Sequence, residues 1–161
     1  MSNFSKQIFN SNNQGSNGQE IGNSVAFNAD GTVMAVGFSE TSLIGGGSVR
    51  IYNYISNQWE TGATYTGESA DDEFGYSVDL NDTGDVCIIG APGAGTGTVY
   101  VVGYEAGVWD INKSSFSKVG TNRLGTSVSV QGTLFDPYIF ASEPTASNNI
   151  GNVIRLNHNE S

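Results

Sequence analysis

Apolar and polar residues alternate along short stretches of this chain, and the arrangement recurs. Its clearest copy, residues 73–92, reads EFGYSVDLNDTGDVCIIGAP, an alternating stretch, a polar turn and then an apolar run. Alternation is typical of a strand with one buried face, and a short apolar run between turn residues is typical of a strand buried on both faces. No segment keeps apolar spacings of three and four over a helical length. The pattern therefore predicts an all-β protein.

Three copies of this pattern follow one another along the chain. They are residues 20–39, 73–92 and 123–144, aligned at Gly22, Gly75 and Gly125 and at a following Ser-Val pair (Ser24, Ser77 and Ser127). A third strand, entered through glycine, is expected at 46–54, 96–104 and 150–158, and a fourth at 58–65 and 108–116. The repeat length of about 50 residues is close to that of four-stranded propeller blades. We therefore expect one repeat domain over 1–161, with units at about 20–65, 73–116 and 123–158.

The alternation also predicts which side chains share a face of each sheet. The residues expected on one common face are Val25 and Phe27, Val78 and Leu80, and Val128 and Val130. The second strand of each unit is apolar on both faces, as in VMAVG, VCIIG and YIFAS. Such strands lie between two layers, so each sheet is expected to be covered on both sides.

The ends of the chain bear on how the ring closes. The third unit lacks a fourth strand, and residues 3–9 (NFSKQIF) precede the first unit as a fourth strand would. A strand from the opposite terminus removes an unpaired sheet edge, so residues 3–9 are expected to complete the last blade. Single-chain propellers have ~4–8 blades. Two chains of three blades would form a six-bladed ring, whereas closure of three sheets within one monomer is the competing arrangement.

Phe74-Gly75 and Gly90-Ala91-Pro92 carry a family resemblance. They resemble the FG-GAP repeat, the blade sequence of the integrin α-subunit propeller and of many microbial and viral surface proteins. The resemblance covers about residues 20–158 and implies a β-propeller-like fold of three four-stranded blades. It also implies a role in adhesion.

FG-GAP repeats often carry a calcium loop between the first two strands, which the resemblance would place at Asp79, Asn81 and Thr83 in the second unit. Calcium requires several converging oxygen ligands, usually including carboxylates. No unit offers more than one carboxylate at the matching positions, and Cys87 stands where an acidic ligand is needed. We therefore expect a hairpin turn built on Asn and Gly, with no metal or other cofactor.

Charge and composition narrow the classes of partner. A net charge of −10 at pH 7 repels nucleic-acid backbones and anionic membrane surfaces. The single cysteine, Cys87, lies in an apolar run and is expected to be a buried hydrophobe. The sequence shows no signal peptide and no apolar stretch long enough to span a membrane.

No combination of residues predicts an enzyme. His158, the single histidine, stands three residues from the C-terminus, and Asp71, Asp72 and Glu73 are adjacent in what reads as an exposed linker. Trp59 and Trp109 occupy matching positions in two units, which favours blade packing over a sugar-stacking platform.

The predicted function is a non-catalytic structural or interaction module displayed on a surface, in the setting of a virion as a phage or viral capsid decoration or tail protein. The alternatives are a carbohydrate-binding propeller lectin and an extracellular adhesion protein. The expected partners are a second copy of the chain, other virion or surface proteins, or glycans. Variable loops on a repeated scaffold usually carry contacts. Those between the second and third strands point to Ser39, Thr41, Gly93, Thr96, Thr145 and Asn148 as contact residues.

Overall fold

The structure is a computed structural model that describes residues 20–39, 46–117, 123–145 and 150–156. Within these residues, eleven β-strands form three antiparallel sheets. The first sheet contains β1 (Glu20–Phe27), β2 (Val33–Ser39), β3 (Ser48–Ile55) and β4 (Gln58–Thr66). The second contains β5 (Ser77–Leu80), β6 (Val86–Ala91), β7 (Thr98–Glu105) and β8 (Val108–Ser117). The third contains β9 (Val128–Gly132), β10 (Pro137–Glu143) and β11 (Asn152–Leu156). The all-β prediction is confirmed.

Within each sheet the strands follow one another in chain order. The observed third and fourth strands coincide with the predicted ones to within a few residues, because glycines and polar turns mark their ends. The predicted N-terminal strand, residues 3–9, lies outside the described residues. The proposal that it completes the third sheet therefore stays a prediction.

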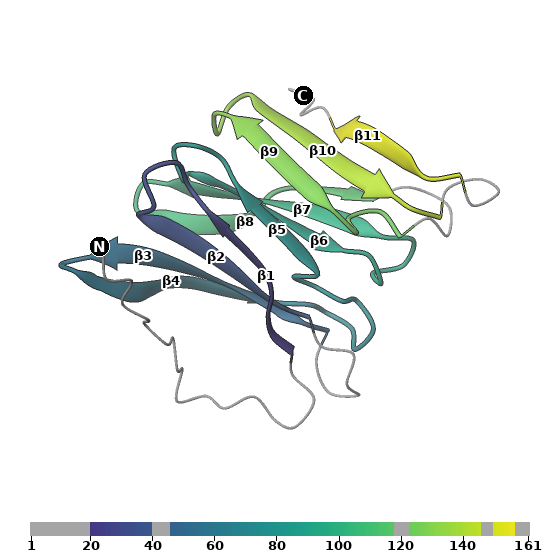
Figure 1. Ribbon diagram of the computed structural model, residues 1–161, viewed down its shortest axis with the longest axis horizontal. Helices are drawn as coiled ribbons and strands as arrows, with labels where there is room; N and C mark the ends of the chain where they lie inside the picture. The colour runs from purple at the N-terminus through teal and green to yellow at the C-terminus, as the bar shows by residue number, and fades with distance from the viewer. Residues whose placement is uncertain (1–19, 40–45, 118–122, 146–149, 157–161) are drawn as a thin grey trace, which may run out of the picture.

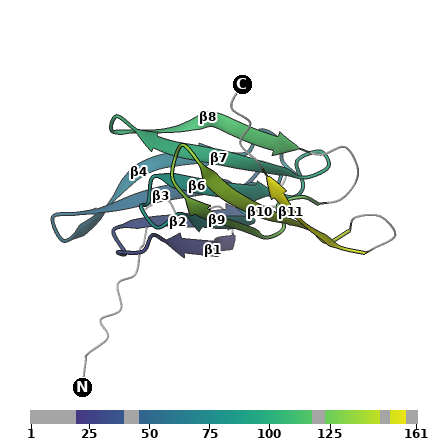
Figure 2. The ribbon, with the colours of Figure 1, turned by 90° about the horizontal axis from the view of Figure 1, so that it is seen from above.

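The three sheets pack face to face in chain order, as Figure 1 shows. Contacts between successive sheets are richest at their first strands, β1 with β5 and β5 with β9, and much sparser between the last strands, β4 and β8. The sheets therefore splay apart from their first strands outward. Figure 2 shows the first sheet stepping from β1 at one edge to β4 at the other.

Two apolar cores fill the spaces between the sheets. We call the packing of the first sheet on the second the first joint, and the packing of the second on the third the second joint. Strand β6 serves both joints and is buried along its whole length. Cys87 and Ile89 point into the first joint, and Val86 and Ile88 point into the second. This alternation is what a strand between two layers requires.

Within one chain, no sheet of the described residues covers the two outermost faces, so the prediction that every sheet is covered on both sides is met only inside the stack. Val25 and Phe27 are 58% and 50% exposed, although the equivalent Val78 and Leu80 are 8% and 4% exposed. On the far side of the third sheet, Tyr138 and Phe140 are 43% and 45% exposed. The predicted common face does exist. It is exposed in the first sheet because the described chain supplies no sheet in front of it.

Candidate interaction surfaces

A serine–glycine contact recurs at both joints. The Ser24 hydroxyl donates a hydrogen bond to the Gly75 carbonyl across the first joint, over 2.8 Å. The Ser77 hydroxyl donates to the Gly125 carbonyl across the second joint, over 2.7 Å. The recurrence of Ser24, Ser77 and Ser127 in the sequence was the signal for this contact, but its role could be seen only in the structure.

Each serine–glycine contact depends on a second glycine in the neighbouring strand. A Cβ atom at Gly37 would lie 2.0 Å from the Gly75 carbonyl oxygen, and one at Gly90 would lie 2.0 Å from the Gly125 oxygen. Real Cβ atoms do not approach this closely, so any side chain at either position would push the sheets apart. The two joints therefore have the same backbone geometry.

Two of the predicted calcium candidates, Asn81 and Thr83, form a hydrogen-bonded turn. Asn81 is fully buried, and its Oδ1 accepts hydrogen bonds from the backbone N–H groups of Asp85 and Val86. Its Nδ2 must therefore be the donating end, and it donates to Asp85 Oδ1 at 2.6 Å and to Thr83 Oγ1 at 2.9 Å. A donor group thus points at the oxygens that a cation would need.

Asp79, the remaining calcium candidate, points away from this turn. Its Oδ2 accepts hydrogen bonds across the second joint from the Val130 backbone N–H at 2.8 Å and from the Ser129 hydroxyl at 3.1 Å. The three candidates therefore do not converge on one point. Among the described residues, no group of three or more His, Cys, Asp or Glu side chains is placed to hold a metal ion.

The first sheet ends the stack in an apolar surface, which we call the outer face of the first sheet. It consists of Val25, Phe27, Trp59 and neighbouring Tyr54. Phe27 packs edge-on against Trp59, with ring centroids 5.9 Å apart, and Tyr54 lies 5.1 Å from the same indole. The equivalent Trp109 of the second sheet is buried in the first core. The difference follows from the position of the sheet, because Trp109 faces the first sheet and Trp59 faces outward.

The third sheet ends the stack in a more polar surface, which we call the outer face of the third sheet. Its exposed side chains are Tyr138, Phe140, Val153 and Arg155, with Ser142 at its end. The Arg155 guanidinium lies over the Tyr138 ring, 4.9 Å from its centroid. Ser142 occupies the position of Gly37 and Gly90, and its hydroxyl accepts a hydrogen bond from the Ser127 backbone N–H. This face therefore differs in shape and polarity from the faces inside the joints.

The predicted loop residues have different surroundings. Gly93 packs against the segment that precedes the second unit, where a Cβ atom would lie 1.8 Å from the Asp71 carbonyl oxygen. Thr96 is half-buried, and its carbonyl accepts a hydrogen bond from the Leu124 N–H. Thr145 is exposed, and Ser39 pairs with Glu20 at the end of β2. Thr41 and Asn148 lie outside the described residues.

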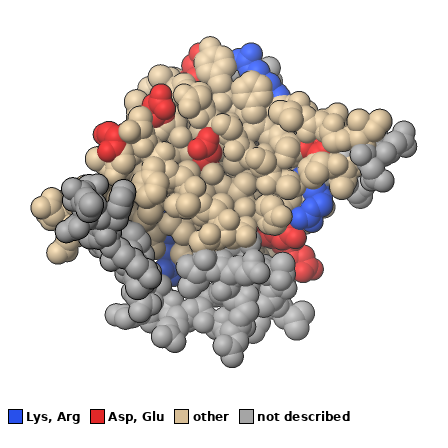
Figure 3. Space-filling view, in the orientation of Figure 1, with Lys and Arg blue, Asp and Glu red and all other residues tan. Residues whose placement is uncertain are grey.

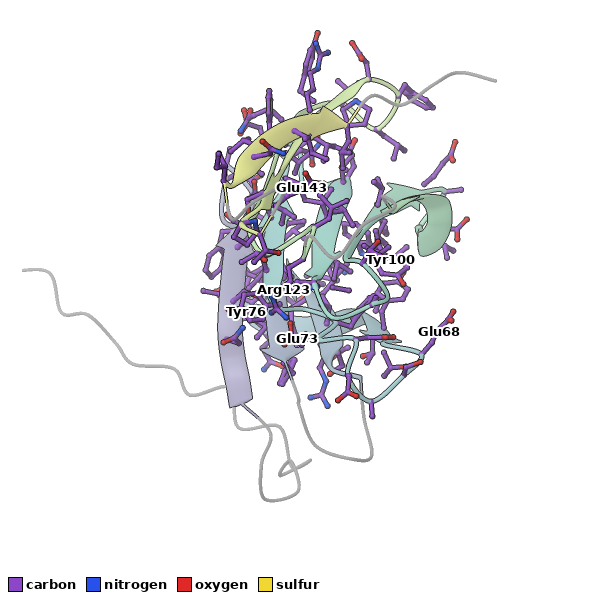
Figure 4. The ribbon with its side chains drawn as sticks, turned by 90° about the vertical axis from the view of Figure 1, so that its right-hand side faces the viewer. Glu68, Glu73, Tyr76, Tyr100, Arg123 and Glu143 are labelled. Carbon is purple, nitrogen blue, oxygen red and sulfur yellow. The ribbon has the colours of Figure 1, made fainter. Side chains whose placement is uncertain are left out.

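An ion pair also connects the second and third units, next to the residues that open each unit. Arg123 contacts Glu73 at 2.5 Å, and its guanidinium lies 6.0 Å from the Tyr76 ring centroid (Figure 4). Arg123 and Glu73 hold equivalent positions, each directly before the buried aromatic or aliphatic residue and glycine that open a unit. The pair is partly exposed, at 41% and 18%, so we assign it less than about 1 kcal/mol.

The acidic residues considered for catalysis have structural surroundings. Asp72 is buried rather than part of an exposed linker, which corrects the expectation for this segment. Its Oδ2 accepts hydrogen bonds from the Glu68 and Ser69 N–H groups at 3.0 and 2.9 Å, so it holds the turn that precedes it. Sequence reasoning also missed Glu143, which is fully buried and accepts a hydrogen bond from Asn152.

The remaining single residues are placed as follows. Cys87 is fully buried, as predicted, and burial raises the pKa of its thiol. Trp109 is 8% exposed, so its ring packs in the core and offers no open platform for a sugar. His158 lies outside the described residues.

Charge on the described surface is dispersed on the side that Figure 3 shows. There the acidic residues are scattered across the face and along its rim, and most of the surface carries neither sign. Within the described ranges, no helix could cross a membrane.

Because they carry exposed apolar side chains, the outer faces of the first and third sheets are the candidate interaction surfaces.

Comparison with known proteins yields a structural likeness but no likeness in sequence. No protein-family model matches the chain, and no curated protein is significantly similar to it in sequence. Among solved structures, Sqt1 from Saccharomyces cerevisiae is similar with a TM-score of 0.47 and 13% sequence identity. The match covers 87% of this chain and 35% of Sqt1, so the chain spans about a third of that protein.

Proposed function

We propose that this protein is a non-catalytic structural module that binds protein partners through the outer faces of its first and third sheets. One observation carries the proposal. Val25 and Phe27 are exposed at positions where the second sheet has the buried residues Val78 and Leu80. Apolar side chains gathered on one exposed face commonly mark an interaction site.

We propose further that the sheets are blades of an FG-GAP-like β-propeller. Supporting this, Phe74 and Leu124 take equivalent buried positions, 2% and 1% exposed, at the start of the second and third units. Each forms an isolated parallel bridge with a glycine of the preceding unit, Gly47 with Phe74 and Gly97 with Leu124. The same residues of the motif thus connect each unit to the next.

Site-specific photo-crosslinking tests the proposed function. A photo-reactive phenylalanine analogue would replace Phe27 or Phe140 in the full chain, and Val108 in a control. Val108 is 64% exposed at the start of β8 in the middle sheet and lies on neither outer face. We expect crosslinked protein adducts, to any protein including the chain itself, from positions 27 and 140 and few from 108. Equal yields at all three positions would contradict the proposal.

The virion setting stays a prediction. Mass spectrometry of particles purified from the source organism would test it, with the protein expected among the surface components.

A further inference from the structure

Residues on the outer face of the third sheet align, strand by strand, with residues of the second sheet that face the second joint. Residues on the outer face of the first sheet align in the same way with residues of the second sheet that face the first joint. We propose that the third sheet of one copy packs on the outer face of the first sheet of a second copy. We call the outer face of the first sheet the head and the outer face of the third sheet the tail, so the copies join head to tail. This inference rests on the proposed function, in that it names the partner of the same two faces. Two copies joined twice in this way would close a ring of six sheets.

The hydrogen-bonding positions of a joint are divided between the two ends of the chain. At each internal joint a serine of one sheet donates to a glycine carbonyl of the next. The third sheet has Ser127, which is exposed, at the donor position. The first sheet has Gly22 at the acceptor position, with φ 79°, close to the φ values of 85° and 90° at Gly75 and Gly125. The tail thus has the donor position and the head has the acceptor position.

Apolar side chains are exposed at both ends of the stack of sheets, at positions that the internal joints bury. Phe27 at the head is equivalent to Leu80, which the first joint buries. At the tail, Phe140 and Val153 hold the positions that Ile88 and Val99 fill in the second joint. Ile88 and Val99 are fully buried, whereas Phe140 and Val153 are 45% and 74% exposed. Joining head to tail would remove both sets from water, which is the main favourable contribution in such contacts.

Charge also favours this order of sheets. Glu73 of the second unit and Arg123 of the third unit occupy equivalent positions, and they form the ion pair of the second joint. In a head-to-tail assembly the unit after the third sheet is the first unit of the second copy, and its residue at the equivalent position is Glu20, at the start of β1. By residue type, the aligned positions of the third sheet and of the next copy's first sheet are therefore opposite in charge.

Ser142 makes this joint weaker than the internal ones. At Gly37 and Gly90, a Cβ atom would collide with the carbonyl of the next unit. The third sheet has Ser142 at this position, so its Cβ atom stands in the path of the Gly22 carbonyl of a second copy. The two sheets must then stay farther apart than at the internal joints. The geometry therefore points to a reversible contact between copies, limited by one side chain.

Light scattering and sedimentation over a range of concentrations test the arrangement. The wild-type chain is expected to exceed the monomer mass of 16.9 kDa in a concentration-dependent way. Phe27→Asp alters only the head and Phe140→Asp only the tail, and each should weaken self-association at least about tenfold. Because both residues are about half exposed, the variants should keep the wild-type thermal midpoint when it is measured at low protein concentration, where self-association does not contribute. Mixing the two variants should restore a pair, because one intact head and one intact tail remain.

Other results of the mixing experiment would overturn the head-to-tail arrangement. If Phe140→Asp self-associates like the wild type and Phe27→Asp does not, two heads pair, and the reverse result means that two tails pair. A wild-type chain that stays monomeric at every concentration also overturns it. That result leaves the proposed function standing if crosslinks to another protein form at positions 27 or 140.

Ser142 is tested by a matched pair of variants. Ser142→Gly removes the Cβ atom and should tighten self-association about tenfold, equivalent to about 1.4 kcal/mol. Ser142→Ala keeps the Cβ atom and removes only the hydroxyl, so it should associate like the wild type. If the glycine variant does not tighten association, or the alanine variant tightens it equally, close backbone approach does not limit the contact.

Discussion

The first and second sheets present the same residue pattern on the same face and yet differ in what covers it. Val78 and Leu80 are 8% and 4% exposed, and the equivalent Val25 and Phe27 are 58% and 50% exposed. Each pair lies two residues apart on its strand, and each pair lies on the side of its sheet that points to the preceding position in the stack. The comparison teaches that alternation encodes which face of a strand is apolar, whereas the presence of a neighbouring sheet determines whether that face is buried.

The close approach of backbones distinguishes the internal joints from the tail even more sharply. Gly37 and Gly90 allow a carbonyl oxygen of the next unit to lie where a Cβ atom would otherwise be. Ser142 has a side chain at the same position. At this position, the internal joints and the outer face of the third sheet thus differ by the presence of a side chain.

The largest effect is expected from Gly90→Ala. Its Cβ atom would lie 2.0 Å from the Gly125 oxygen and 2.3 Å from the Ser77 hydroxyl. Neither backbone can yield without separating the sheets, so we expect a loss of more than about 4 kcal/mol or failure to fold. Urea unfolding followed by tryptophan fluorescence would measure the free energy of unfolding.

Gly22→Ala is the control for this variant. Gly22 has φ 79° and no atom within 4 Å of an added Cβ, so only backbone strain of about 1 kcal/mol is expected. Equal losses in the two variants would show that conformational strain, rather than the close approach, sets the cost.

A smaller difference is expected between Leu80→Ala and Phe27→Ala, which truncate equivalent positions. Leu80 lies in the first core, and its loss should cost about 2–4 kcal/mol through the cavity that remains. Phe27 is half exposed and should cost less than about 1 kcal/mol. Both values would be measured by urea unfolding at low protein concentration, where self-association does not contribute. Similar losses would mean that the outer face is already covered in the isolated chain.

The smallest effect is expected from Tyr65→Phe, a substitution that copies the second sheet. Tyr65 pairs with Val49 in the first sheet as Phe116 pairs with Val99 in the second. The Tyr65 hydroxyl is buried and finds no hydrogen-bond partner among the described residues. Its removal should therefore change stability at neutral pH by less than about 1 kcal/mol.

The same variant should change the response to alkali. Burial, followed by the nearby charge of Asp110, raises the pKa of Tyr65 to about 12 from 10.0. The folded protein therefore holds this proton to a higher pH than the unfolded chain does. The stabilisation is complete below about pH 10 and is lost as the pH rises toward 12. Tyr65→Phe should make the fall in unfolding free energy over this interval less steep. An unchanged slope would contradict the assignment.

Much of the fold could be predicted from the sequence because the relevant signals are local. Strand alternation, the glycines that open each unit and the Asn81–Gly84 turn require only a few neighbouring residues. The candidate surfaces were less accessible. Asp72 reads as a solvated acid but is buried by hydrogen bonds to the turn before it. Asp79 and Asn81, two residues apart, point to different partners, a distinction that motif spacing does not contain.

The sequence by itself thus determined the strands, their order, the three repeated units and the apolar face of each, because these follow from the period of the strand and the geometry of turns. Only the tertiary structure decided which faces are buried, which serine meets which glycine carbonyl and where the stack ends. Those properties depend on the sheet that lies opposite, and a residue at position 27 has the same local pattern as one at position 80. Burial is a relation between sheets, so it emerges only when the sheets are assembled.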